Sequence, residues 1–306
     1  PVYANANRSE YATEFSVKDR MDLTTTTRFW LGLRHVIYDR RSEQNEPQGS
    51  NVSAIDGSAI SPWLALSTQI DEKTLYVSHG YGLEQFVTPN ASASFANPGE
   101  QLGVKKSSQT EVGIRQPSKA HGFEWSAAAF HISRPLAYDI FDANTWLSTR
   151  YLDGKQTHTG IDISMGWHNA VWTFNGQAQV VKARISEVAL HPEIGTRPLN
   201  VPKYTLRGLV QYRFADVPGL RTSLRLSHEG ARRVTEDGSI NLPSWTTLDF
   251  AAHYDTRISG TRTQWTLAID NLADHHYWRE APKQFGHYYL YPGAPRTFRM
   301  GVKASF

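Results

Sequence analysis

The feature that most constrains this chain is an alternation of apolar and polar residues that recurs along its whole length. In stretches of about ten residues, every second side chain is apolar, which is the period of a β-strand and not of a helix. One stretch places Ile161, Ile163 and Met165 on one face and Asp162 and Ser164 on the other. We therefore expect an all-β fold.

The connections between these stretches alternate between short and long. The thirteen predicted strands lie near residues 10–20, 27–40, 61–70, 74–83, 104–116, 123–134, 156–168, 171–185, 203–215, 221–234, 244–256, 262–272 and 288–306. Links such as 71–73 and 169–170 are short, whereas 41–60, 84–103 and 135–155 are predicted to be long loops. Tight turns at one end and large loops at the other are typical of an outer-membrane barrel. The pattern predicts an antiparallel transmembrane β-barrel.

Composition narrows the function classes. The chain has nine Trp and fourteen Tyr, as expected where rings gather at a membrane interface, and no apolar run long enough for a transmembrane helix. It has no cysteine, which excludes disulfides and thiolate metal sites. A net charge of +3 without a run of basic residues argues against a nucleic-acid partner. A soluble β-rich binding module remains an alternative.

Several segments, in order, resemble one known family. The most specific are "LAIDNLADHHYW" at 267–278 and the closing "YPGAPRTFRMGVKASF" at 291–306. Upstream, "LGLRHVIYD" at 31–39, "TEVGIR" at 110–115 and "LPSWTTLDFAAHY" at 242–254 continue the series. The chain resembles the C-terminal part of the barrel of TonB-dependent outer-membrane siderophore receptors.

The resemblance implies a 22-stranded barrel with an N-terminal plug folded inside it. Nothing here resembles the plug or the TonB box, so residues 1–306 are expected to be a C-terminal portion of the barrel, with about thirteen of its strands. The implied function is TonB-coupled uptake of a ferric siderophore by a bacterial outer-membrane, multi-pass barrel. A passive porin or an autotransporter-type barrel is the alternative within membrane proteins.

The resemblance also implies the partners. These are a ferric siderophore, the TonB-ExbB-ExbD complex, which would act through the N-terminal part, and outer-membrane lipid with lipopolysaccharide. The complete protein is expected to be a monomer. No covalent chemistry and no cofactor are expected. The sequence has no G-x-S-x-G, H-E-x-x-H or P-loop motif, which agrees with a protein that is not an enzyme.

Ligand contact is expected from side chains in two of the long loops, because aromatic faces and tyrosine hydroxyls suit a bulky, partly apolar chelate. The candidates are Tyr138, Trp146, Tyr151, Trp278, Phe285, His287 and Tyr288. For each of them, membership of an interfacial aromatic belt is the alternative role.

Basic side chains on the polar faces are a second set of candidates. Arg207, Arg213, Arg299 and Lys303 are expected to face the lumen, where positive charge would concentrate an anionic complex. The alternative is that a polar lumen needs paired charges, with the plug or with Asp162 and Asp249 as partners.

Phe306 and the adjacent histidines complete the candidates. Phe306 is expected to anchor the last strand at the membrane interface, and the resemblance implies that barrel-assembly machinery recognises it. On a strand, the adjacent His275 and His276 would point to opposite faces and could bind one ion only if a loop bent them together. Because no ligand spacing of the usual zinc type occurs, no protein-bound metal is predicted.

Overall fold

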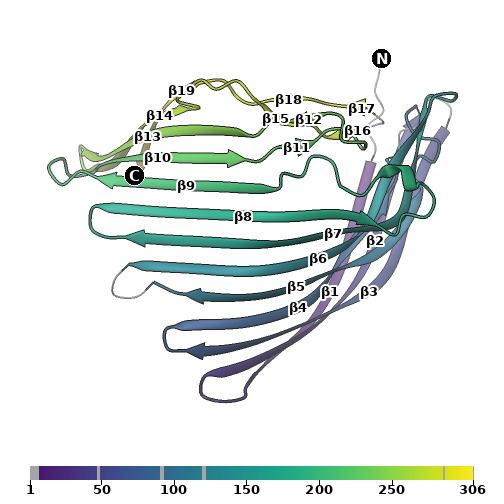
Figure 1. Ribbon diagram of the computed structural model, residues 1–306, viewed down its shortest axis with the longest axis horizontal. Coiled ribbons are helices and arrows are strands. Elements are labelled where there is room, and N and C mark those ends of the chain that lie inside the picture. Colours follow the sequence, from purple (N-terminus) through teal and green to yellow (C-terminus); the bar gives the residue numbers. More distant parts are fainter. Residues whose placement is uncertain (1–6, 47–48, 90–92, 119–121, 285–286, 306) are drawn as a thin grey trace.

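In the computed structural model, thirteen strands form a single antiparallel sheet (Figure 1). The structure describes residues 7–46, 49–89, 93–118, 122–284 and 287–305. The sheet follows chain order apart from short inserted strands. Its strands are β1 (Asn7–Asp22), β2 (Thr27–Glu46), β3 (Gly49–Ile70), β4 (Lys73–Val87), β5 (Gln101–Gln116), β6 (Phe123–Asp142), β7 (Leu147–His168), β8 (Trp172–Ser186), β9 (Tyr204–Arg213), β10 (Leu220–Glu229), β13 (Trp245–Ile258), β14 (Thr261–Asp270) and β19 (Thr297–Ser305).

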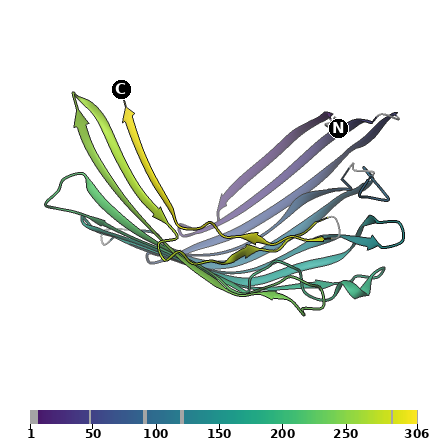
Figure 2. The ribbon, with the colours of Figure 1, turned by 90° about the horizontal axis from the view of Figure 1, so that it is seen from above.

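The sheet is bent into an open trough (Figure 2). Strand β1 lies at one edge and β19 at the other, and the two edges rise on opposite sides of the opening. Over the part of the chain that the structure describes, neither edge strand has a second neighbour. This is the curvature of a barrel wall that is incomplete between β19 and β1, and it confirms the predicted strand number.

The two ends of the wall differ, as predicted. At the turn end, hairpins are tight: Asp71 and Glu72 join β3 to β4, and Ser259 and Gly260 join β13 to β14. Asp71, Ser259 and Gly260 have φ values of 53°, 50° and 84°, the left-handed backbone that two-residue hairpins require. At the opposite, loop end, longer connections carry the short strands β11 (Arg232–Arg233), β12 (Asn241–Leu242), β15 (Trp278–Glu280), β16 (Lys283–Gln284), β17 (His287–Tyr288) and β18 (Tyr291–Pro292), and the 3-10 turn η1 (Pro192–Ile194).

Two of the predicted long loops are instead strands, so this part of the prediction was wrong. Strands β6 and β7 have 20 and 22 residues, which leaves only 143–146 as the connection between them. About ten residues suffice to cross the hydrocarbon, so the remainder projects beyond it as a hairpin. Its tip is closed by Asp142, whose carboxylate accepts hydrogen bonds from the Asn144 amide at 2.9 Å and the Thr145 hydroxyl at 3.1 Å. The 41–60 region likewise belongs mostly to β2 and β3.

The last predicted strand is shorter than expected. It was placed at 288–306, but β19 begins at Thr297. Pro292 and Pro295 lack the amide that a central ladder needs, and the residues before β19 form the small β15–β18 and β16–β17 pairs instead.

The sheet has one apolar and one polar face. Ile161, Ile163 and Met165 are 52%, 43% and 57% exposed, an arrangement that fits contact with hydrocarbon. The polar face lines the trough and is called the lumen face below; the apolar one is the outer face. The buried hydrophobic cluster found among the described residues, Val234, Leu242 and Ala281, lies in the loops and not in the wall. No helix in the described ranges is long and apolar enough to span a membrane.

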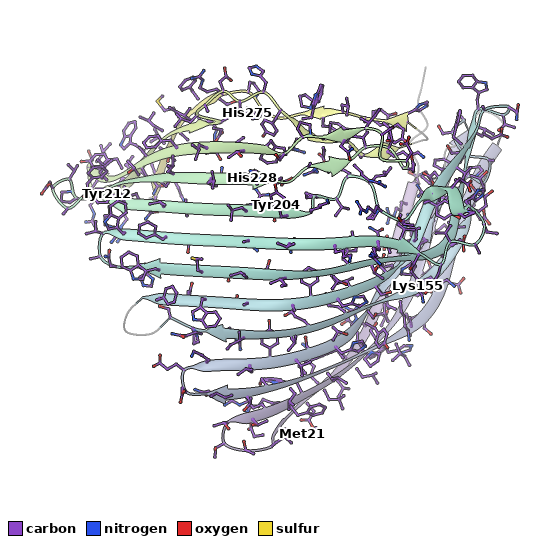
Figure 3. The ribbon with its side chains drawn as sticks, viewed as in Figure 1. Met21, Lys155, Tyr204, Tyr212, His228 and His275 are labelled. Carbon is purple, nitrogen blue, oxygen red and sulfur yellow. The ribbon has the colours of Figure 1, made fainter. Side chains whose placement is uncertain are left out.

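Aromatic rings gather on the outer face near the turn end. The Trp172 ring lies 5.6 Å from Phe174 and 4.6 Å from Tyr212, and Trp167 lies 5.5 Å from Phe174 (centroid distances). Figure 3 shows Tyr212 at this end of the wall. Rings in this position mark the interface between hydrocarbon and headgroups.

Candidate ligand-binding loops and lumen wall

Two of the predicted tyrosines meet on the projecting β6–β7 hairpin. Tyr138 and Tyr151 are cross-strand partners with ring centroids 5.8 Å apart, and His191 from the β8–β9 loop lies 6.0 Å and 4.7 Å from them. The Tyr138 hydroxyl donates to Asp153 at 3.1 Å, and the same carboxylate oxygen accepts the amides of 189–190 at 2.9 Å. Burial and the hydrogen bond to Asp153 raise the pKa of Tyr138. The β8–β9 loop is therefore held against these two rings.

The same hairpin is anchored to the β4–β5 loop through Arg150. Its guanidinium donates to both carboxylate oxygens of Asp139, at 2.7 Å and 2.9 Å, and to the Val87 carbonyl at 3.2 Å. Asn97 accepts the Arg150 amide at 3.0 Å and donates to its carbonyl at 2.9 Å. The guanidinium carbon also lies 5.4 Å from the centre of the buried Phe95 ring. Loop and hairpin thus share one set of polar contacts.

The last loop reaches the hairpin near its tip. His287 lies 6.1 Å from Phe141, and Phe141 lies 6.0 Å from the exposed Trp146 (ring centroids). The last loop therefore contributes an imidazole to the aromatic surface that the hairpin presents.

A second contact ties the last loop to the β10–β13 loop. Glu236 accepts hydrogen bonds from the Tyr288 hydroxyl and from Lys283 Nζ, the latter at 2.6 Å. Burial and the bond to Glu236 raise the pKa of Tyr288 to about 12. Burial by itself would raise the pKa of Glu236, but the hydrogen bonds from Lys283 and Tyr288 outweigh it and lower that pKa. At neutral pH the three groups form a charged, hydrogen-bonded clamp.

The remaining loop candidates lie elsewhere. Trp278 is 43% exposed and pairs with Pro292 between β15 and β18, away from the contacts given above. Phe285 and Phe306 lie outside the described residues. The structure thus brings Tyr138 together with Tyr151. It places His287 beside Phe141, which in turn contacts Trp146, and it connects Tyr288 to a neighbouring loop.

Two of the four basic candidates are neutralised by carboxylates on adjacent strands. Arg207 lies 2.8 Å from Glu229, and Arg299 lies 2.7 Å from Asp270. The two predicted aspartate partners were wrong for these candidates: Asp249 pairs with Arg225 at 2.9 Å, and Asp162 accepts a hydrogen bond from Gln177 at 3.4 Å. Pairing with the plug stays a prediction. Strand register decides this, because each arginine meets the acid that its own neighbouring strand places beside it.

The other two lumen candidates have no acidic partner within the described ranges. Arg213 is the cross-strand partner of Arg221, and Lys303 is that of Gln264. Both stand towards the turn end of their strands, far along the wall from the loop-end aromatic side chains.

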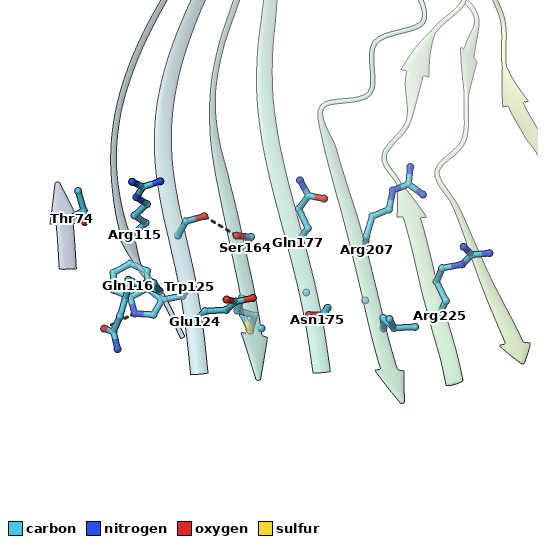
Figure 4. Close-up of a pocket in the computed structure, with 17 residues that line it drawn as sticks. Thr74, Arg115, Gln116, Glu124, Trp125, Ser164, Asn175, Gln177, Arg207 and Arg225 are labelled. Carbon is cyan, nitrogen blue, oxygen red and sulfur yellow. Dashed lines mark hydrogen bonds between the residues drawn. The ribbon is translucent and has the colours of Figure 1, made fainter. Parts of the chain in front are cut away.

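The lumen face is hollowed across β4 to β10 (Figure 4). A recess of about 820 Å³ is lined by Arg115, Arg207 and Arg225, with Glu124 as the acidic residue among them. Arg207 and Arg225 are paired with Glu229 and Asp249, which leaves the recess only weakly basic. Within the described part of the chain, no group of three or more His, Asp or Glu side chains could hold a metal ion.

The family model described as TonB dependent receptor-like, beta-barrel matches residues 1–272. The chain belongs to this family. A curated relative, the metal-pseudopaline receptor CntO of Pseudomonas aeruginosa, is 22% identical over 318 residues, which cover 100% of this chain and 43% of CntO.

Solved structures of receptors share the fold. BauA, the ferric preacinetobactin receptor from Acinetobacter baumannii, superposes with a TM-score of 0.74 at 23% identity, over 99% of this chain and 44% of BauA. The ferric-catecholate import receptor Fiu from E. coli K12, in its closed form, gives 0.74 at 17% identity, over 98% and 45%. The chain spans less than half the length of these relatives.

Family membership confirms several predictions. The protein is a β-barrel protein of the bacterial outer membrane, and its family consists of receptors and transporters, not enzymes. No comparison tests the individual loop or lumen residues, which stay predictions.

Sequence reasoning missed the polar residues that hold the loops in place. Arg150, Asp153, His191, Glu236 and Lys283 contact side chains or backbone far along the chain. None of them belongs to an alternating pattern or a spaced motif, so the sequence offered no signal beyond a polar residue in a predicted loop.

Proposed function

We propose that the complete receptor takes up a ferric siderophore by TonB-coupled active transport, and that residues 1–306 supply a C-terminal portion of its barrel. The observation that carries the proposal is a pair of aromatic and imidazole clusters at the loop end. Tyr138, Tyr151 and His191 form one, and Phe141 with His287 forms the other, on the opposite face of the β6–β7 hairpin. They draw on this hairpin, the β8–β9 loop and the last loop, and each of these segments is held by polar contacts outside the rings.

These clusters suit a metal chelate for physical reasons. Aromatic faces contact the apolar parts of a bulky chelator, while the hydroxyl of Tyr151 and the imidazoles offer polar contacts that set its orientation. Because Asp153 and Glu236 fix the loops in advance, less conformational entropy is lost when a ligand binds.

The lumen wall supports passage rather than tight retention of an anionic complex. Arg207 and Arg299 are partly neutralised by Glu229 and Asp270, so they line a polar path without forming a bare basic site. The recess beside Arg115 offers a weakly basic surface further along the wall. In this proposal TonB, with ExbB and ExbD, supplies the energy through the N-terminal part of the receptor, which is monomeric.

A metal other than iron is a second candidate cargo. The curated relative that this chain matches along its whole length is a metal-pseudopaline receptor. The loop chemistry recognises the chelator and not the ion, so it accommodates either case.

Fluorescence quenching of the full-length receptor tests the proposal. Trp146 is 75% exposed and lies beside Phe141, so a bound ferric chelate is expected to quench it. Trp146→Phe should lose a substantial part of the quenching, while Trp172→Phe, in the aromatic girdle at the turn end, should keep it. A panel of ferric siderophores and the same chelators loaded with other metals identifies the cargo. Folded receptor that no chelate quenches would contradict the function.

A further inference from the structure

Three loops at the loop end meet at one side chain. Asn200 lies in the β8–β9 loop with a left-handed backbone (φ 58°), and its amide donates to the Arg233 carbonyl of the β10–β13 loop at 2.9 Å. Its side-chain Oδ1 accepts hydrogen bonds from Arg232 Nη1 at 3.1 Å and from the Ala281 amide of the last loop at 3.0 Å. Asn200 thus contacts both other loops, whose short strands Figure 1 shows together beyond the ends of β9 and β10.

The orientation of the Asn200 amide group is decided by these partners. The Ala281 backbone N–H and the Arg232 guanidinium can only donate, so the side-chain oxygen and not the nitrogen must face them. Ala281 is fully buried and Arg232 is 8% exposed. Loss of the oxygen would deprive two buried donors of an acceptor, which costs more than the hydrogen bonds themselves contribute. Position 200 therefore needs a short side chain with an acceptor on a left-handed backbone, and asparagine meets both needs.

Further contacts hold the same three loops together. A Cβ atom at Gly195 (φ 82°) of the β8–β9 loop would lie 3.2 Å from the Glu236 carbonyl oxygen of the β10–β13 loop, so the two backbones run close together there. The buried cluster described above takes Val234 and Leu242 from the β10–β13 loop and Ala281 from the last loop. The Glu236 clamp joins the same two loops. The three loops are therefore packed as one unit, called the loop body below.

The loop body contacts the β6–β7 hairpin through two imidazoles. His191 of the β8–β9 loop lies against the paired tyrosines, whereas His287 of the last loop lies beside Phe141 on the opposite face of the hairpin. Asn200 connects the two sides, because its contacts join the loop that carries His191 to the loop that carries His287. If these contacts were lost, the two imidazoles could move independently.

We propose that Asn200 is a positioning residue, which joins the three loops into one body and thereby sets the spacing of His191 and His287 before a chelate arrives. For its cargo, this inference rests on the proposed function. Joining two binding segments in advance lowers the conformational entropy that is lost when one ligand contacts both. The alternative is that Asn200 stabilises the β8–β9 loop alone, while the other two loops move separately.

Double electron–electron resonance on the full-length receptor, with no chelate added, tests the inference. Spin labels on Glu193→Cys and Arg279→Cys report the distance between the β8–β9 loop and the last loop. Both native side chains are exposed (65% and 61%), and residues 1–306 contain no cysteine that would also be labelled. We expect one narrow distance peak with Asn200 in place. Asn200→Gly keeps the left-handed backbone and removes the side chain, so it should widen this peak at least about twofold through the loss of the two side-chain hydrogen bonds.

The matched control is Glu187→Gly. Glu187 lies in the same loop with a φ of 59°, and its exposed carboxylate pairs with Lys155 at 2.8 Å. The peak should keep its width in this variant. Heat-modified mobility on gels verifies that each variant is folded. If Asn200→Gly does not fold, Arg232→Met takes its place, because it removes one of the two donors to Asn200 and should widen the peak as well.

The outcomes separate this inference from the proposed function. A broad peak with Asn200 in place, an unchanged peak in folded Asn200→Gly or Arg232→Met, or equal widening in Glu187→Gly would overturn the inference. A receptor that gives the expected peaks but binds no chelate would contradict the proposed function alone. A receptor that binds a chelate but shows a broad peak with Asn200 in place would contradict this inference alone.

Discussion

Replacing Arg150 by alanine tests whether the loop-end surface is held in place before ligand arrives. The substitution removes two hydrogen bonds to the Asp139 carboxylate and one to the Val87 carbonyl. Charge-assisted bonds contribute about 1.5–3 kcal/mol each. The Arg150 and Asp139 side chains are 27% and 16% exposed, so we take the lower end of that range for each of the two bonds to Asp139. The two bonds together then contribute about 3 kcal/mol. This corresponds to roughly hundredfold more frequent opening of the hairpin.

Hydrogen exchange measured by mass spectrometry on the full-length receptor is the assay. Peptides covering the upper halves of β6 and β7 should exchange faster by that factor in Arg150→Ala, while peptides near the turn end stay unchanged. Arg279→Ala is the matched control, because among the described residues Arg279 forms an ion pair with Glu280 alone, and its side chain is 61% exposed. Surface pairs of this kind contribute about 0–1 kcal/mol. Equal exchange in Arg150→Ala and wild type would show that the polar anchor does not hold the hairpin.

Three further outcomes are expected. Because the Glu236 pKa is lowered in the fold, the clamp with Lys283 is stabilising above the ordinary range of a glutamate and is lost as pH falls through the lowered value. The protection of residues 232–240 against hydrogen exchange, corrected for the intrinsic exchange rate at each pH, should fall on acidification in wild type and not in Glu236→Gln. Ile163→Arg, on the lipid face, should cost about 2–4 kcal/mol in guanidinium unfolding of the lipid-embedded barrel, whereas Ser164→Arg on the lumen face should cost far less. Deletion of Phe306 should lower the amount of folded receptor in the outer membrane, which immunoblotting of membrane fractions measures; normal levels would argue against its role in assembly.

The strands were predictable because a lipid-facing wall imposes its constraint on every residue. Ile163 and Ser164 must face opposite environments, and this requirement recurs in each strand crossing the bilayer. Beyond the bilayer the constraint ends, so the outer parts of β6 and β7 were predicted as loops although they continue the ladder. Ladder hydrogen bonds and contacts with neighbouring loops, such as that of the buried Phe95 with Ser148, maintain them there.

The candidate site was predictable only as a region. Tyr138 and Tyr151 could be named from their residue type, but His191, forty residues beyond Tyr151, reaches them through loop geometry. The lumen arginines show the same limit: pairing of Arg207 with Glu229 depends on the β9–β10 register. Residue type indicates what a side chain can contact, whereas register and loop path decide what it does contact.

The two edge strands run in the same direction. Strand β1 runs from the loop end to a tight turn, and β19 follows the last loop and runs towards the same end. Neighbours in an antiparallel wall alternate in direction, so β19 cannot pair with β1 in an antiparallel ladder, either within one chain or between two copies inserted in the membrane in the same orientation. Antiparallel closure of this wall requires an odd number of strands between them. Added to thirteen, any odd number gives an even total, the parity of bacterial single-chain barrels.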